Sequence, residues 1–202
     1  TEDLKRLWPM ILNAASFLVK NGPVTAQDRW EEDPGYSPFT LAVEISALLA
    51  AANLADLQGE AQIGTYLRET ADTWNSNIEH WIYVTDTDLA HQAGVDGYYV
   101  RVAPQDIADA AAPSKGYVPI KNRPPGESSE PAAQIVRPDA LALLRFGLRP
   151  ADDTRIINTV KLIDTVLKIA LPYGPGWHRY NDDGYGEHSD GEAFDGTGVG
   201  RV

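Results

Sequence analysis

Apolar positions recur at helical spacing in three long segments of the chain, which are separated by polar turns. The first segment covers residues 2–20 and contains Pro9, so we expect a kink or a fresh start there. The second begins at Ser37-Pro38, where a hydroxyl N-cap precedes a proline at the first helical position. The third covers residues 59–81, and its short link to the second predicts that these two helices lie antiparallel.

The helical period fades between residues 84 and 137. The aromatic and β-branched residues of Tyr98-Tyr99-Val100-Arg101-Val102 predict a short strand. The stretch 112–131 is rich in proline and glycine and predicts an irregular loop. Loops of this length inside domains are usually functional or mobile, so we expect this part of the chain to contribute to a site.

Helical spacing returns over residues 141–146 and again from Asp152 until Pro172. The remaining tail, residues 177–202, is rich in glycine, aspartate and aromatic residues and has no clear period. A chain of 202 residues suffices for one sizeable core, so one domain is expected. We find no apolar run approaching the roughly 20 residues that span a bilayer.

The composition narrows the choice of partners. Asp plus Glu number 29 against 17 Lys plus Arg, for a net charge of −12, which repels nucleic acid and anionic membranes. A neutral oligosaccharide feels no such repulsion, and the five Trp and nine Tyr suit the faces of sugar rings. Aromatic residues serve an ordinary helical core equally well. Cysteine is absent, which excludes disulfides and thiolate metal sites.

Candidate chemistry gathers before the second helix, in Gln27-Asp28-Arg29-Trp30-Glu31-Glu32-Asp33. A carboxylic acid beside an indole and other carboxylates resists ionisation, and glycoside hydrolysis needs such a proton donor. If the segment is helical, Asp28 lies on the same side as Glu31 and Glu32, and mutual repulsion keeps a proton bound. The simpler interpretation is a solvated acidic turn, since anions favour helix N-termini.

The run QDRWEEDPGYSP resembles the catalytic-acid segment of glycoside hydrolase family 15, the inverting glucoamylases and glucodextranases. The resemblance extends to LWPMILNAASFLVKNGP before it, and after it to WNSNIEHWIYVTDTDLAHQAGVDGYYVR and WHRYNDDGYGEHSDGEAFDGTGVGRV. It implies an all-α fold that is part of an (α/α)6 toroid of the six-hairpin type, with long loops carrying the substrate pocket. Residues 1–202 would then be a partial catalytic domain, truncated at both ends.

The resemblance also implies residue roles. Glu31 matches the general acid. The positions that match substrate-binding residues are Asp28, Trp30, Glu32, Arg179, Asp183 and Tyr185. Without the resemblance, residues 179–185 read as an Asp-Gly turn whose arginine is held by nearby carboxylates.

The implied parent protein is an exo-acting hydrolase that releases β-glucose from the non-reducing ends of starch, maltooligosaccharides or dextran. An inverting enzyme needs a second carboxylate roughly 6.5–9.5 Å from the first. The family's general base lies beyond residue 202, so we expect the isolated chain to be inactive. The acidic residues of the glycine-rich tail could be offered as substitutes: Asp190, Glu192 and Asp195. Specificity for α-1,4 or α-1,6 linkages, or for trehalose, stays open.

Other classes of function remain alternatives at this point. One is a non-catalytic helical carbohydrate-binding or interaction protein on the same scaffold, and another is an α,α-trehalase within the family. A metal-dependent cyclase on the toroid is disfavoured, because the chain has four histidines and no cysteine. No cofactor is required, although calcium is compatible with four acidic positions: Asp86, Asp88, Asp182 and Asp183. The expected partners are an α-glucan and the rest of the parent polypeptide. The family's habits imply an extracellular location, with a cytoplasmic one as the alternative.

Overall fold

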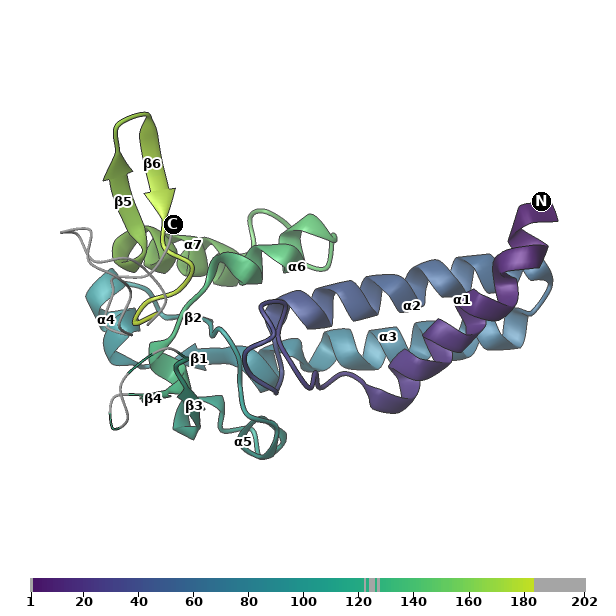
Figure 1. Ribbon diagram of the computed structural model, residues 1–202, viewed down its shortest axis with the longest axis horizontal. Helices are drawn as coiled ribbons and strands as arrows, with labels where there is room; N and C mark the ends of the chain where they lie inside the picture. Colours follow the sequence, from purple (N-terminus) through teal and green to yellow (C-terminus); the bar gives the residue numbers. More distant parts are fainter. Residues whose placement is uncertain (1, 122, 124–125, 127, 184–202) are drawn as a thin grey trace.

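Three long helices form the N-terminal half of the computed structural model, which describes residues 2–121, 123, 126 and 128–183 (Figure 1). They are α1 (Glu2–Asn21), α2 (Pro38–Gln58) and α3 (Ala61–Ile82). The first is one helix that runs through Pro9, so of the two alternatives expected there, a kink or a fresh start, the fresh start is wrong. The second begins at Pro38 as predicted, but the Ser37 hydroxyl makes no capping hydrogen bond, so that part of the prediction is wrong. Gly59, with φ 80°, ends α2 in the left-handed conformation. Since the chain reverses within three residues, α2 and α3 pack antiparallel, which confirms that prediction.

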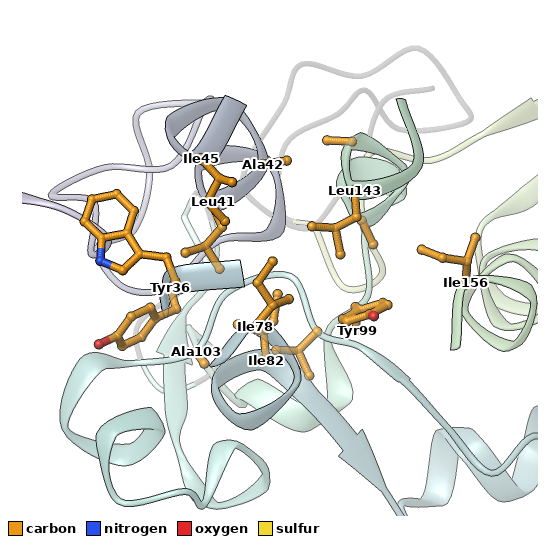
Figure 2. Packing of buried hydrophobic residues seen from close by; sticks show 14 of the residues in the cluster. Tyr36, Leu41, Ala42, Ile45, Ile78, Ile82, Tyr99, Ala103, Leu143 and Ile156 are labelled. Atoms are coloured by element: carbon orange, nitrogen blue, oxygen red, sulfur yellow. The ribbon is translucent and has the colours of Figure 1, made fainter. Parts of the chain in front are cut away.

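The central helix of the core is α2, which packs against α1, α3 and the short helix α6 (Leu141–Arg145). In Figure 2, Leu41 and Ile45 of this helix lie in one cluster with Ile78 and Ile82 of α3. Within the described part of the chain, α2 is also long and apolar enough to cross a membrane by composition, contrary to our expectation from the sequence. Its contacts with three other helices account for that composition, because a helix buried on several faces is apolar all round.

Short elements make up the C-terminal half (Figure 1). The helices are α4 (Asp88–Ala93), α5 (Gln105–Asp109), α6 and α7 (Thr154–Val166), with 3-10 turns at Pro113–Lys115, Ala132–Gln134 and Pro138–Ala140. Three antiparallel hairpins pair β1 (Tyr83–Thr85) with β2 (Gly97–Tyr99), β3 (Tyr117–Pro119) with β4 (Ser129–Pro131), and β5 (Lys168–Leu171) with β6 (Gly174–Trp177). The strand expected at residues 98–102 overlaps β2 only at Tyr98 and Tyr99, since β2 starts one residue earlier and ends before Val100. The predicted loop at 112–131 contains the small β3–β4 hairpin.

The last predicted helix is wrong at its C-terminal end. It stops at Val166 instead of continuing to Pro172, and the next residues form the β5–β6 hairpin. Four residues of mixed character do not separate strand from helix by period alone. A two-residue turn at Pro172-Tyr173 reverses the chain, and Gly174, with φ 136°, follows it as the first residue of β6.

The loop between α1 and α2 is fastened at its base before it reaches the acidic segment. Thr25 and Gly35 exchange two backbone hydrogen bonds of 3.0 Å, and Tyr36 and Ala103 exchange two more of 2.8 and 2.9 Å. Glycine is required at position 35, since φ is 136° and a Cβ atom there would lie 2.4 Å from the carbonyl oxygen of Ala103. This close approach joins the acidic loop to the segment that follows β2.

Candidate active site

The acidic segment forms a tight turn that is organised by Asp28. The Asp28 carboxylate accepts hydrogen bonds from the backbone N–H groups of Trp30 (2.9 Å) and Glu32 (3.2 Å). Its carbonyl oxygen accepts one from Glu31 N–H (2.9 Å), and its own N–H donates to the carbonyl of Asp33 (2.9 Å). The helical arrangement that we considered from the sequence is therefore wrong here. An aspartate that binds nearby backbone N–H groups competes with helix formation.

Glu31 differs from its acidic neighbours in both backbone and side chain. Its φ is 60°, in the left-handed region, which costs a residue with a side chain about 1–2 kcal/mol. Its side chain is exposed and makes no hydrogen bond or ion pair with any residue that the structure describes. Asp28 and Asp33, by contrast, are buried. The turn thus buries the carboxylates on either side and presents that of Glu31.

Two buried arginines hold the other carboxylates of the turn. Arg101, whose side chain is 0% exposed, contacts Asp28 at 3.2 Å and Glu32 at 3.1 Å, and it also binds Asp33. Arg137 contacts the same oxygen of Asp28 at 2.8 Å and Glu32 at 3.3 Å. Bridging by guanidinium groups fixes the carboxylates in position, since each arginine has several donors in one plane.

The second predicted cluster, residues 179–183, lies directly against this turn. Arg179 is 2.8 Å from Glu32 and forms two hydrogen bonds with Asp183, at 2.6 and 2.8 Å. Burial opposes the charge of Arg179, but the hydrogen bonds and charge of Asp183, together with Glu32, outweigh it and raise the pKa of the guanidinium. The side chain of Asn181 fastens this loop to residues 134–136, with bonds of 2.6 and 2.8 Å. The structure therefore joins two segments that are about 150 residues apart.

Two aromatic rings complete the cluster. Tyr180 is buried, and its ring centroid lies 4.6–5.0 Å from three guanidinium carbons, those of Arg101, Arg137 and Arg179. Such contacts offset part of the repulsion between like charges, because the face of an aromatic ring is negative. Trp30 is 45% exposed and lies beside Arg29 and Arg179, at 5.1 and 5.4 Å. It offers an open apolar surface next to Glu31.

Sequence reasoning missed the arginines that organise this site. From the sequence we expected the carboxylates of Asp28, Glu31 and Glu32 to repel one another. In the structure, a cluster of five carboxylates lies among four guanidinium groups. The acidic members are Asp28, Glu32, Asp33, Asp139 and Asp183, and the basic members are Arg29, Arg101, Arg137 and Arg179. One signal was present in the sequence: Arg101 interrupts an apolar run in a predicted strand, and a charged residue there is buried only with partners.

The acidic positions considered for calcium do not come together. Asp86 pairs with His91 at 3.1 Å, while Asp182 lies 3.6 Å from Arg123. In the described residues, no group of three or more histidine or acidic side chains is placed to hold a metal ion. Tyr185 and the tail positions Asp190, Glu192 and Asp195 lie outside the described residues, so their predicted roles stay predictions.

The chain is similar in sequence and structure to known glycoside hydrolases. A family model described as "Glycosyl hydrolases family 15" matches residues 2–195. A glucoamylase from Clostridium sp. (strain G0005) is 37% identical over 190 residues, which cover 93% of this chain and 25% of that protein. A crystal structure of a bacterial glucoamylase complexed with acarbose superposes with a TM-score of 0.86 at 37% identity, over 97% of this chain and 28% of that one. The chain thus spans about a quarter of the length of these relatives, and its helices match part of an (α/α)6 toroid.

Proposed function

The chain belongs to glycosyl hydrolase family 15, and from that membership we propose that it supplies the proton-donating part of the active site of an inverting, exo-acting α-glucan hydrolase. Glu31 is the general acid. The observation that carries this proposal is the turn at residues 28–33, where Glu31 alone of four acidic side chains is exposed and unpaired among the described residues. The glucoamylase complex with acarbose supports an α-glucan as the substrate class.

The proposed reaction assigns one proton transfer to this chain. The carboxylic acid of Glu31 donates its proton to the oxygen that bridges two sugars, and the bond from that oxygen to the anomeric carbon breaks. A water molecule attacks the anomeric carbon from the opposite face and gives a proton to a second carboxylate. By the resemblance to the family, this base lies beyond residue 202. The products are β-glucose and a glucan shorter by one unit.

Arg179 and Trp30 are the proposed sugar contacts beside Glu31. The guanidinium of Arg179 is held by Glu32 and Asp183 in one orientation, which leaves less entropy to lose when it binds hydroxyl groups. The exposed ring of Trp30 provides a flat apolar surface for the C–H face of a sugar. Asp183, which is 2% exposed, contributes through its hold on Arg179.

The test uses a longer polypeptide that carries this chain and the downstream glutamate. Wild type and Glu31→Gln are compared on maltose, isomaltose and trehalose, and the first product is followed by proton NMR. We expect β-glucose from the wild type and a rate at least about 100-fold lower for the variant. Near-normal hydrolysis by Glu31→Gln would discard the acid assignment. An α-configured first product would exclude inversion, and the relative rates on the three sugars would settle the linkage.

A further inference from the structure

We propose that Asp28, held by Arg101 and Arg137, is a positioning residue that locks the backbone of Glu31 in the orientation the acid needs. The proposal rests on the function proposed above. It gives Asp28 a different task from the direct contact with sugar that the family resemblance implies. Asp28 acts on the reaction through the peptide groups around Glu31.

The backbone at Glu31 needs such a lock, because a left-handed conformation is unfavourable for any residue that carries a side chain. Three consecutive N–H groups, those of residues 30, 31 and 32, all donate to Asp28, two to a side-chain oxygen and one to the carbonyl oxygen. The peptide groups on both sides of Glu31 are therefore tied to one residue. Strain of this kind persists only where the surroundings over-determine the conformation.

The arginines hold Asp28 itself in place. Its second oxygen, Oδ2, is 3.2 Å from Arg101 and 2.8 Å from Arg137, and its side chain is 0% exposed. Rotation of this carboxylate would leave two buried guanidinium groups short of a partner, which is costly for charges that are shielded from solvent. With one oxygen bound to the turn and the other to the arginines, neither oxygen is open to a ligand.

The consequence lies in the direction of the Glu31 side chain. Of the two acidic residues that follow it, Glu32 turns inward to both arginines and Asp33 to Arg101, whereas Glu31 faces solvent. Loss of the Asp28 contacts would free residue 31 to relax toward the ordinary right-handed region and re-aim its carboxyl. A displacement of about 1 Å at a reacting group is enough to lower a rate on the order of 100-fold.

The experiment separates proton donation from sugar binding by the choice of substrate. Maltose needs a proton on its leaving oxygen, whereas α-glucosyl fluoride loses fluoride as an anion and reacts with water without that proton. In the longer polypeptide with both catalytic carboxylates, we expect Asp28→Asn to lower kcat on maltose about 10- to 100-fold, with KM changed less than about 3-fold. On the fluoride, kcat should fall less than about 3-fold.

Asp153→Asn is the matched control. Asp153 also accepts a hydrogen bond from a backbone N–H group, that of Arg155, at 2.8 Å, and it binds the guanidinium of Arg155 at 2.6 Å. It lies at the start of α7, outside the acidic cluster. The kcat of the Asp153→Asn variant should stay within about 2-fold of wild type on both maltose and α-glucosyl fluoride. Thermal melts followed by circular dichroism show whether each variant is folded. If Asp28→Asn is not folded, Arg137→Gln makes the same test, since it removes the 2.8 Å contact and leaves Arg101 in place.

The possible outcomes are distinct. Equal losses on both substrates, a rise in KM that accounts for the loss, or an unchanged rate on maltose would each overturn the positioning role of Asp28. A Glu31→Gln variant that hydrolyses maltose normally would instead overturn the proposed function. Glu31→Gln could lose activity on maltose and keep activity on α-glucosyl fluoride while Asp28→Asn behaves as wild type. That result would support Glu31 as the general acid and overturn the positioning role of Asp28.

Discussion

Replacing Arg101 by methionine should cost the chain about 3–5 kcal/mol of unfolding free energy, the usual cost of removing one partner from a buried ion pair. The side chain of Arg101 is 0% exposed and contacts three carboxylates. Asp28 and Glu32 retain Arg137 as a partner. Asp33 is 1% exposed and has no other ion pair with a described residue, so its buried charge dominates the cost.

Urea titration followed by circular dichroism measures this loss. Arg155→Met is the matched control, because Arg155 also pairs with two carboxylates but is 37% exposed, and exposed pairs contribute about 1 kcal/mol or less. The double variant Arg101→Met with Asp33→Asn should recover part of the loss, since it removes the unpaired charge. A loss below about 1 kcal/mol for Arg101→Met, or one no larger than that of Arg155→Met, would refute the claim that buried arginines hold the acidic turn.

Three further perturbations test other parts of the structure. Burial raises the pKa of Glu44 from 4.5 to about 7, so the folded chain binds this proton more tightly and stability falls as pH rises between these values. Glu44→Gln should remove this fall, about 1–2 kcal/mol after solvent screening, in urea titrations at pH 4 and pH 8. Asn181→Ala removes both side-chain bonds to residues 134–136 and should cost about 1–3 kcal/mol and weaken maltose binding by the longer polypeptide; unchanged calorimetric affinity would contradict this. Gly35→Ala should cost at least about 2 kcal/mol, because its Cβ would meet the carbonyl of Ala103, and an unchanged melting temperature would show that the loop is not fastened there.

Local signals in the sequence account for most of the helical scaffold. Pro38 and Gly59 mark the ends of α2, because N1 prolines and left-handed glycines act within a single turn. The hydroxyl cap predicted at Ser37 is wrong, since its side chain makes no capping hydrogen bond. The apolar spacing of α2 and α3 predicts their pairing, and a link of only two residues favours an antiparallel arrangement. Family resemblance adds the toroid, which no periodicity within this chain shows.

The site could be predicted only in part, because its geometry depends on contacts between distant segments. Residues 28–33 and 179–183 were identified, but the arginines that join them come from positions 101 and 137. Nothing in the spacing of the acidic residues indicates that Asp28 binds the N–H groups around Glu31 and gives it a positive φ. A turn of this kind follows from three-dimensional pairing, which sequence patterns do not encode locally.

The assignment of Glu31 is tested most directly by a crystal structure of the longer polypeptide with acarbose bound. The distance to measure joins the Glu31 carboxyl oxygens to the acarbose nitrogen that replaces a bridging oxygen between two rings. We expect about 2.6–3.2 Å, the reach of a general acid to the atom that it protonates. A separation above about 5 Å without a bridging water, with another acid in hydrogen-bonding contact with that nitrogen, would contradict the assignment of Glu31 as the proton donor.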